Sequence, residues 1–478
     1  MMLRRTKIIA TLGPATDDRP AIERLIRTGI DLVRINFSHG SLADQKRRVN
    51  TVRECAAELG REVGILGDLQ GPKIRIARFQ TGGINLKEGQ SFILDSGLAG
   101  CDGSQERVGI DYKQLPADVK KGDCLLLDDG RIELQVDRVD NIKIDCTVKI
   151  GGDLSDNKGI NLKGGGLSAN ALTAKDCQDL EAAVCMMVDY VAVSFVRNAA
   201  DVHEARQLLK NFSGTAGIIA KIERSEAVEA IDEIIQASDG IMVARGDLGV
   251  EIGDAEVPAI QKQIIESARA LDKPVITATQ MMESMIHSPV PTRAEVSDVA
   301  NAVIDGTDAV MLSGETAVGK HPEKVAIAVE RVCLAAERQP STRISRHRVN
   351  RRFKRVDEAI SMSAMYAANH LDIKAIVALT ESGSTPLWMS RIRTAIPIFG
   401  LSRHSESLGK MTLYRNVYPL FFDVTRHQRD EIKREAVSVL EKQGLLNKGD
   451  MAIITKGDQD GVYGMTNAMK IVEVGQVV

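Results

Sequence analysis

Two oppositely charged side chains, Lys221 and Glu223, stand two positions apart in the sequence, at the end of a short apolar run. Residues two apart on a β-strand leave the same face, so this ammonium and this carboxylate can meet one ligand. Asp247, which follows Gly246, adds a second carboxylate, and two such hard oxygen ligands suit Mg²⁺ completed by water and substrate phosphate. The pattern predicts metal-assisted chemistry on an anionic substrate. The alternatives are a solvated ion pair and an ordinary Gly-Asp turn.

Arginine and hydroxyl side chains follow other apolar runs. Arg34 and Arg75 are candidate phosphate contacts, because the guanidinium fork matches phosphate oxygens. Thr279 is a candidate ligand-binding residue, with the N-cap of a helix as the alternative role. Thr292 stands three residues before Glu295, and this capping box is interpreted as structural only.

These residues need a scaffold that brings their loops together, and the sequence repeats one suitable unit. An apolar run rich in β-branched residues is followed by a polar turn and a segment with helical periodicity. Eight such runs predict an α/β fold, a (β/α)8 TIM barrel, with the active site at the carboxyl ends of its strands. The expected strands are Lys7–Leu12, Leu32–Asn36, Gly64–Leu69, Tyr190–Phe195, Gly217–Ile222, Gly240–Ala244, Pro274–Ala278 and Ala309–Leu312. The expected helices are Pro20–Thr28, Asp44–Leu59, Asp201–Lys210, Glu226–Gln236, Pro258–Leu271 and Pro322–Arg338.

Two segments interrupt or follow this series. Lys73 to Gly166 is rich in Gly, Asp and short strand-like runs, which predicts an inserted small β-barrel domain. After Gln339 a basic stretch leads to a second βα series, which predicts a separate C-terminal α/β domain. Its expected strands are Ala375–Ala378, Ile396–Gly400, Tyr418–Phe421 and Met451–Ile454. The expected domains are 1–70 with 167–342 for the barrel, 71–166 for the insertion and 343–478 for the C-terminal domain.

The composition favours an ordinary globular protein of about three domains at ~150 residues each. The 478 residues are 44% hydrophobic and 27% charged, with a formal net charge of −3. Nothing in this balance suggests a nucleic-acid or membrane partner. Seven scattered cysteines without a Cys-x-x-Cys pair indicate reduced thiols. With no signal-peptide core, we expect a cytoplasmic protein.

The longer motifs resemble those of the pyruvate kinase family. The matching stretches are Lys7–Ala15, Arg34–Gly40, Lys221–Glu223, Ala244–Gly249, Ala278–Met285 and Pro291–Val303. They occur in the family's order and approximate spacing, and the match covers nearly the whole chain. The resemblance implies transfer of the phosphoryl group of phosphoenolpyruvate to ADP, giving pyruvate and ATP in glycolysis. It also implies that the inserted domain is a lid that closes over the nucleotide.

The resemblance implies a role for each matching residue. Glu223 and Asp247 would bind Mg²⁺ or Mn²⁺, and Lys221 would stabilise charge on the phosphoryl group and the enolate. The residues implied to hold phosphoenolpyruvate are Arg34, Gly246, Asp247 and Thr279, with Thr279 and Arg75 also counted as catalytic. The residues implied to contact the nucleotide are Asn36, His39, Arg75 and Lys158. Ser313 and Glu315 match the loop after the eighth strand, without a firm role.

A monovalent-cation site is a further expectation. Asn36, Ser38 and Asp68 form an oxygen-rich cluster, which could hold such an ion or satisfy backbone groups. In potassium-dependent members of the family, these residues and the backbone carbonyl of Leu69 bind K⁺, and the position of Lys73 holds Glu. A fixed ammonium at Lys73 could replace the ion, which predicts activity without K⁺.

Regulation and assembly are also implied. The hydroxyl-rich loop of Thr380, Ser382, Gly383, Ser384 and Thr385 resembles the family's effector site and is a plausible phosphate cradle. Glu381 would repel a phosphate, with Arg391 and Arg393 as the expected compensating cations, so we expect a monophosphate or nucleotide as effector. The alternative is a capped helix start in a domain used for subunit contacts. The family's usual assembly is a homotetramer.

Two rival functions remain open from the residues. One is a Mg²⁺-enolate lyase or aldolase on a similar barrel, which would use the same pair of carboxylates. The other is a non-catalytic, metabolite-sensing relative, which would be expected to lack a metal ligand or the lysine.

Overall fold

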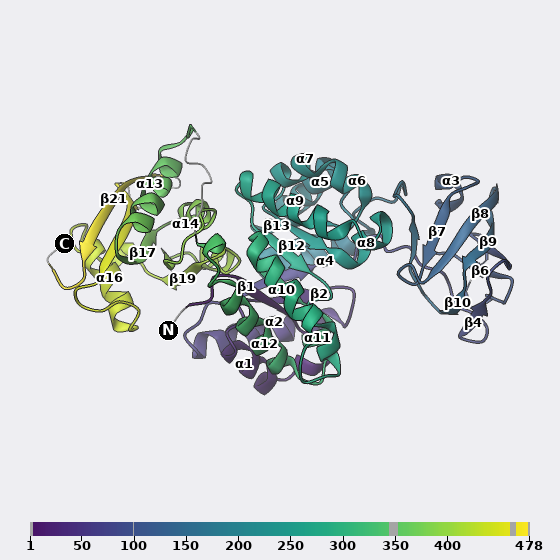
Figure 1. Cartoon of the computed structure of the whole chain (residues 1–478), viewed down its shortest axis with the longest axis horizontal. Coiled ribbons are helices and arrows are strands. Elements are labelled where there is room, and N and C mark those ends of the chain that lie inside the picture. The colour runs from purple at the N-terminus through teal and green to yellow at the C-terminus, as the bar shows by residue number, and fades with distance from the viewer. Residues whose placement is uncertain (1–2, 99, 344–351, 459–464, 477–478) are drawn as a thin grey trace.

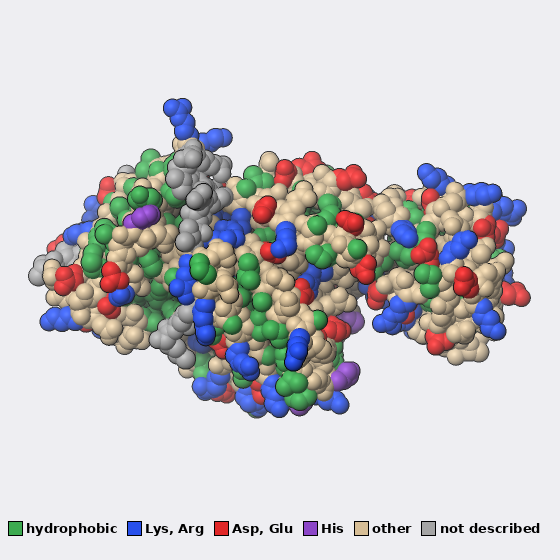
Figure 2. Space-filling model, in the orientation of Figure 1, with side chains coloured by type: hydrophobic (Ala, Val, Ile, Leu, Met, Phe, Trp, Pro, Cys, Tyr) green, Lys and Arg blue, Asp and Glu red, His purple; other side chains and the backbone are tan. Residues whose placement is uncertain are grey.

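The chain folds into three parts arranged in a row, and its computed structural model describes residues 3–98, 100–343, 352–458 and 465–476. A barrel lies in the middle, a sheet-rich domain on one side of it and an α/β domain on the other (Figure 1). Side chains of both charges are mixed over the face of all three parts that Figure 2 shows. None of the described helices is both long and apolar enough to cross a membrane.

The central part is a closed barrel of eight parallel strands, as the sequence predicts. The order around the barrel is β1-β16-β15-β14-β13-β12-β3-β2. The strands are β1 (Lys7–Thr11), β2 (Leu32–Asn36), β3 (Gly64–Asp68), β12 (Tyr190–Val193), β13 (Gly217–Ile222), β14 (Gly240–Ala244), β15 (Val275–Ala278) and β16 (Ala309–Leu312). Their ends lie within two residues of the predicted ends.

Along each barrel strand, the side chains point alternately into two different apolar cores. Ile8, Ile65 and Ile218 belong to the core shared with the surrounding helices, whereas Leu66 and Ile219 belong to a second core, which fills the barrel and continues into the C-terminal domain. Side chains of successive strand residues point to opposite faces, so the inward row continues two residues at a time toward the carboxyl ends. The apolar inward residues at the bottom of the barrel are therefore followed by polar inward residues at its rim.

Helices surround the barrel. They are α1 (Arg19–Arg27), α2 (Leu42–Glu58), α4 (Ala174–Cys185), α5 (Ala199–Asn211), α6 (Ser225–Glu229), α7 (Ile231–Ala237), α8 (Arg245–Ile252), α9 (Val257–Ala270), α10 (Arg293–Asp305), α11 (Gly314–Ala317) and α12 (Pro322–Ala336). The single helix predicted over Glu226–Gln236 is wrong in one respect, because Ala230 leaves helical geometry and divides it into α6 and α7. The capping box of Thr292 and Glu295 is confirmed at the start of α10.

The inserted segment between β3 and β12 forms a sheet-rich domain with its own apolar core. Its elements are β4 (Gly83–Leu86), β5 (Ser91–Asp95), β6 (Arg107–Gly109), α3 (Leu115–Asp118), β7 (Cys124–Leu127), β8 (Ile132–Asp140), β9 (Lys143–Ile150), β10 (Gly152–Ser155) and β11 (Ile160–Leu162). Six strands form the sheet β11-β7-β8-β9-β5-β6, and β10 pairs with β4. The limits at 71 and 166 stay a prediction.

The C-terminal domain is a five-stranded sheet, β19-β18-β17-β20-β21, with helices packed on it. Its elements are α13 (Val356–His370), β17 (Ile373–Leu379), α14 (Ser384–Ser390), β18 (Ile398–Ser402), α15 (Ser405–Met411), β19 (Val417–Phe421), α16 (Ile432–Lys442), β20 (Met451–Gly457) and β21 (Thr466–Glu473). The edge strand β21 is absent from the sequence-based prediction. Most of its side chains are exposed or half-buried, so it lacks the apolar run by which the other strands are recognised.

The amino end of the barrel packs on the C-terminal domain through buried polar contacts. The carboxylate of Asp308, just before β16, accepts hydrogen bonds from both terminal nitrogens of Arg391 and from the backbone N–H of Arg415. It also accepts from the backbone N–H of Val275, 3.0 Å away, so one side chain joins two barrel strands to two segments of the neighbouring domain. Asp308 is 1% exposed, which makes this a buried ion pair.

Candidate functional site

The ammonium of Lys221 is the centre of a polar cluster at the carboxyl ends of the strands. Lys221 follows Ile219 in the inward row of β13, and its Nζ lies 2.9 Å from Glu223 Oε1 and 3.3 Å from Asp68 Oδ1. It also donates a hydrogen bond to Ser194 Oγ, 2.7 Å away. Arg34, in the inward row of β2, donates from Nε to Asp68 Oδ2 at 2.6 Å. Two cations and two carboxylates therefore share one nearly buried site.

Burial and neighbouring opposite charges have opposite effects on the pKa values of this cluster. Burial disfavours the ammonium of Lys221, but the carboxylates of Asp68 and Glu223 outweigh burial and raise its pKa above the ordinary value. Burial likewise opposes the charge of Asp68, yet Lys221 and Arg34 lower its pKa. Burial and the charge of Asp247 raise the pKa of Glu223, against the effect of Lys221. The lysine stays charged at neutral pH, while the carboxylate of Glu223 lacks full compensation.

The carboxylates of Glu223 and Asp247 suit a divalent cation that also binds water and substrate, rather than a metal held by protein ligands alone. The described residues contain no group of three or more His, Cys, Asp or Glu side chains that could hold a metal. Two carboxylates leave several coordination positions for water and substrate phosphate, which is the usual arrangement for Mg²⁺. A bound cation would also relieve the repulsion that raises the pKa of Glu223.

Thr279 does not cap a helix, so the alternative role from the sequence is wrong. It follows β15 in the left-handed region, with φ of 68°, and Gln280 follows with φ of 54°. Its hydroxyl accepts the backbone N–H of Gly246 at 3.0 Å, and its carbonyl accepts from Arg245 Nη2 at 2.6 Å. Left-handed backbone at non-glycine residues is costly and is concentrated at functional sites. Thr279 and Gly246 thus form one rigid wall of the rim.

The expected monovalent-cation residues lie together, but Lys73 points elsewhere. Asn36 and Asp68 are paired across β2 and β3, and Asn36 Oδ1 accepts the N–H of Ser38 at 3.0 Å. The Leu69 carbonyl accepts from Ser194 Oγ. Lys73 Nζ lies 3.5 Å from Asp247 Oδ1, and in the described part of the chain no hydrogen bond or ion pair joins it to the four oxygen-bearing residues.

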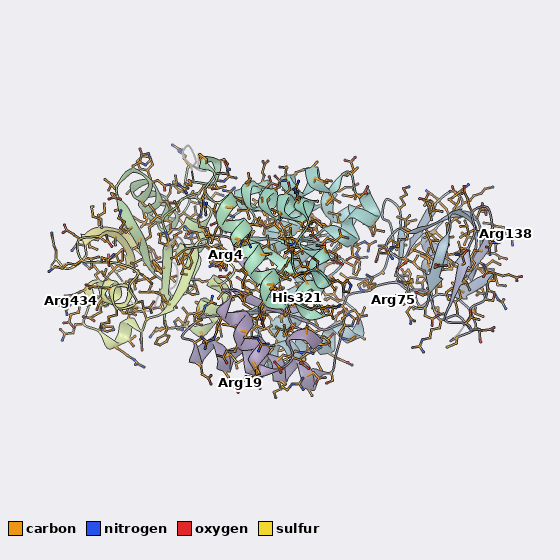
Figure 3. All side chains as sticks on the ribbon, turned by 60° about the horizontal axis from the view of Figure 1, so that its bottom comes forward. Arg4, Arg19, Arg75, Arg138, His321 and Arg434 are labelled. Carbon is orange, nitrogen blue, oxygen red and sulfur yellow. The ribbon has the colours of Figure 1, made fainter. Side chains whose placement is uncertain are left out.

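The expected nucleotide contacts are not gathered at the rim in this structure. Arg75 donates to the carbonyl of Asn157 at 2.8 Å, and Lys158 pairs with Asp128 at 2.6 Å, both within the inserted domain. Figure 3 shows Arg75 where the chain passes between the barrel and that domain. His39 is exposed beyond the end of β2. No hydrogen bond or ion pair among the described residues links Arg75, Lys158 or His39 to Lys221.

The hydroxyl-rich loop lines a cavity in the C-terminal domain, together with Lys456 and Thr466. The cations expected to compensate Glu381 are wrong, because Glu381 pairs with Arg403 at 3.3 Å and with His404. Arg391 lies at the junction with the barrel instead, bonded to Asp308. Within the loop, Thr380 Oγ1 accepts the N–H of Gly383 and Ser382 bonds Ser384, whereas Thr385 bonds Thr466 of β21.

Sequence reasoning missed several residues that fix the site. Ser194 and the N–H of Phe195 bond Lys221 and Glu223, and Arg245 holds Thr279. Glu315 was placed by its sequence in the loop after the eighth strand without a firm role. It is fully buried, accepts the backbone N–H groups of Met282 and Ser313, and so ties together the loops after β15 and β16. The signal for Ser194 was present, because it continues the inward row of Tyr190 and Ala192. Phe195 and Arg245 gave no such signal.

Comparisons with known proteins cover almost all of the chain. Residues 3–326 match the family model described as pyruvate kinase, barrel domain, and residues 358–472 match pyruvate kinase, alpha/beta domain. The chain is 55% identical over 476 residues to pyruvate kinase II of Salmonella typhimurium, covering 99% of each chain. It is 54% identical to a pyruvate kinase of Buchnera aphidicola, with the same coverage. A crystal structure of a pyruvate kinase from Cryptosporidium parvum superposes with a TM-score of 0.92 at 35% identity, covering 98% of this chain and 96% of that one.

Proposed function

This chain belongs to the pyruvate kinase family, and we propose that the Lys221 cluster at the barrel rim performs its phosphoryl transfer. The family's activity converts phosphoenolpyruvate and ADP into pyruvate and ATP. The observation that carries the assignment to this site is the ammonium of Lys221, held 2.9 Å from Glu223 beside the wall of Gly246 and Thr279. The site combines a fixed positive charge, two carboxylates that would bind the metal and a rigid surface for an anion.

The residues divide the chemistry among them. During transfer the bond between the phosphorus and the enol oxygen breaks, and the phosphorus bonds to a terminal oxygen of ADP. The enolate left behind takes up a proton at carbon to become pyruvate. Lys221 and Arg34 offset the negative charge on the phosphoryl oxygens and the enolate, and their preformed positions require little reorganisation. Glu223 and Asp247 would hold Mg²⁺ or Mn²⁺, which supplies further charge stabilisation when bound.

Nucleotide binding would involve a movement of the inserted domain. We assign Asn36, His39, Arg75 and Lys158 to the nucleotide, and two of these lie on the barrel side and two on the inserted domain. Gly164, Gly165 and Gly166, at the return to the barrel, all have positive φ, which provides a backbone suited to a hinge. Closure would bring Arg75 toward the rim and exclude water.

The direct test is a coupled assay of pyruvate formation from phosphoenolpyruvate, ADP and Mg²⁺. Turnover that disappears on chelation of the metal would support the proposed site. An Mg²⁺-enolate lyase or aldolase would act on other substrates in the same buffer and leave ADP unchanged. A metabolite-sensing relative would show no turnover, even with sugar phosphates or AMP added.

We also propose that the enzyme does not require K⁺. The support is the ammonium of Lys73 beside Asp247, which supplies a positive charge at the rim without a bound ion. The parent should keep its activity when K⁺ is replaced by tetramethylammonium, whereas Lys73→Glu should lose activity many-fold and regain it with K⁺. The assay is the initial rate at matched ionic strength. A parent that itself loses activity many-fold without K⁺ would contradict the proposal.

Regulation by a phosphorylated effector is proposed for the loop of Thr380 to Thr385. The support is its cavity, its hydroxyl groups and the neighbouring Lys456, with Glu381 neutralised by Arg403. Addition of a sugar monophosphate or AMP should change the dependence of rate on phosphoenolpyruvate. This response should be lost in Ser384→Asp, which places a carboxylate in the cavity, and persistence of the response would count against the assignment.

Assembly into a homo-oligomer, as a tetramer, is proposed from exposed apolar side chains of the C-terminal domain. Val356 and Tyr366 of α13 are more than half exposed, and Met469 and Ile471 lie on the edge strand β21. An apolar edge of this kind favours pairing with another surface. Light scattering after size-exclusion chromatography would give the mass directly, and a monomer at micromolar concentration would refute the proposal.

A further inference from the structure

The chain returns from the inserted domain to the barrel beside the elements that carry the metal-binding carboxylates. Glu223 stands two residues before α6, and Asp247 lies in the first turn of α8. Figure 1 shows both helices on the side of the barrel that faces the inserted domain. The three glycines of the return, 164–166, contact the start of α6 and the end of α8. A movement of the inserted domain would therefore change contacts next to the proposed metal site.

Side chains at the start of α6 hold these glycines by hydrogen bonds. Ser225 Oγ donates to the carbonyl of Gly164 at 2.8 Å, and the N–H of Gly166 donates to Glu226 Oε1 at 2.6 Å. The N–H of Gly164 also donates to the carbonyl of Glu251, near the end of α8, at 3.0 Å. A hydrogen bond to a carboxylate is stronger than one between neutral groups. The bond to Glu226 is therefore the main contact of the three.

The middle glycine fits against α6 only because it has no side chain. A Cβ built on Gly165 would clash with Ser225 Oγ and would lie 2.7 Å from Glu226 Oε2. Gly164 and Gly166, on either side of it, have φ of 86° and 101°, and glycine adopts such angles as readily as negative ones. The segment is thus pressed against α6 in this structure, while its backbone is free to take other conformations.

Buried contacts fix the chain at both of its connections to the barrel. Gly71, where the chain leaves the barrel, donates its N–H to Asp176 Oδ1 at 3.0 Å, and Asp176 is fully buried. The carbonyl of Leu167, just after the glycines, accepts from Arg224 Nη2 at 2.7 Å, and Arg224 is 3% exposed. The side chain of Glu226 is 32% exposed. Water can replace the partner of Glu226 but not those of the buried groups, so its contact breaks at lower cost.

We propose that Ser225 and Glu226 are positioning residues whose contacts with 164–166 form a latch, which holds the inserted domain away from the rim and opens when the domain closes over the nucleotide. This inference rests on the function proposed above. While the latch is formed, Arg75 and Lys158 bond within the inserted domain and not at the rim. Neither latch residue contacts the reacting groups. Both act through the position of the domain that carries Arg75.

A latch of this kind lowers the fraction of the enzyme that is ready to bind the nucleotide. The apparent affinity for a ligand falls in proportion to the population of the binding-competent state. Removal of Glu226 should therefore lower KM for ADP about threefold to tenfold, for the loss of one partly exposed bond to a charged group. The bond from the N–H of Ser168 to Asp118 of the inserted domain remains, so we expect no larger change. We expect no increase in kcat, since release of ATP requires the domain to open.

The test is KM for ADP at saturating phosphoenolpyruvate and Mg²⁺. Glu226→Ala removes the acceptor of the N–H of Gly166 and should lower KM for ADP. Ser225→Ala removes the donor to Gly164 without a change of charge and should cause a smaller decrease. Glu229→Ala is the matched control on the same helix and should keep the parental constant. The side chain of Glu229 is exposed, and it forms no hydrogen bond or ion pair with the residues that the structure describes.

Two further comparisons separate the latch from a structural role. Glu226→Gln keeps an oxygen that can accept from Gly166 and should lie between the parent and Glu226→Ala. Ser225→Ala leaves the ion pair of Arg224 with Glu226 in place, so its effect does not depend on that arginine. An unchanged or raised KM for ADP in both alanine variants would overturn the latch. If the parent turns over normally, the proposed function survives that result, whereas a parent without turnover would contradict both.

Hydrogen exchange of the backbone gives a readout that does not depend on turnover. In the parent, the N–H of Gly166 should be protected by Glu226, and saturating ADP with Mg²⁺ should speed its exchange as the latch opens. The N–H of Gly71, bonded to the buried Asp176, should exchange slowly in both states and is the internal reference. Mass spectrometry of overlapping peptides measures both positions. Exchange at Gly166 that slows or stays constant when the nucleotide is added would refute the latch.

Discussion

Lys221→Met should lower kcat for pyruvate formation about 10²–10³-fold, the usual effect of removing one preformed charge-stabilising group from an active site. Methionine fills a similar volume but supplies no charge to the phosphoryl group or to the developing enolate. KM for phosphoenolpyruvate should change less than kcat, because the interaction strengthens as charge develops on the enolate. The coupled assay at saturating ADP and metal separates the two constants.

The same substitution leaves Glu223 and Asp68 without the ammonium that compensates them, so thermal unfolding must show that the variant is folded. Lys210→Met, at the exposed carboxyl end of α5, is the matched control and should retain the parental rate. A folded Lys221→Met enzyme with kcat within about threefold of the parent would exclude the proposed role, because a threefold change corresponds to less than about 1 kcal/mol.

Asp308→Ala should destabilise the native chain by about 3–5 kcal/mol, the cost of leaving a buried charge without its partner. Arg391 would keep a buried guanidinium, and the N–H groups of Val275 and Arg415 would lose their acceptor. Because several domains unfold, the measurement is the midpoint and amplitude of each transition in urea, followed by circular dichroism. We expect the transition that separates the barrel from the C-terminal domain to move most.

Two variants make this result specific. Asp308→Asn keeps an acceptor without the charge and should lie between the parent and Asp308→Ala. Asp140→Ala, at an exposed acidic residue of the inserted domain that also pairs with an arginine, should change stability by less than about 1 kcal/mol. Equal midpoints for Asp308→Ala and Asp140→Ala would show that the junction does not depend on the Asp308–Arg391 pair.

The sequence predicts the barrel and much of its rim because both depend on local patterns. Runs such as Gly217–Ile222 carry apolar residues on both faces, and the inward row runs directly into Lys221 and Glu223. The same alternation identifies Arg34 and Asp68 as inward residues of neighbouring strands. The residue types and the fold thus predict the polar cluster before any distance is known.

Other features depend on contacts between residues far apart in the sequence. Arg391 was interpreted as a counter-ion for Glu381, ten residues away, but it pairs with Asp308, which is 83 residues away. Lys73 belongs to a loop whose side-chain direction no periodicity fixes, and it reaches Asp247. The distance of Arg75 from the rim follows from the orientation of a whole domain, which local sequence does not encode.

The position of the insertion has a consequence for synthesis of the chain. The segment leaves after β3 and returns before β12, and these two strands are neighbours in the closed barrel. The inserted domain contains its own core, so we expect it to fold on the ribosome while most barrel strands are still to be made. The barrel can close only after β16 is translated, because β16 pairs with β1. A nascent chain that has emerged as far as about residue 172 should therefore contain a folded inserted domain attached to three strands, of which β1 still lacks β16 and β3 still lacks β12.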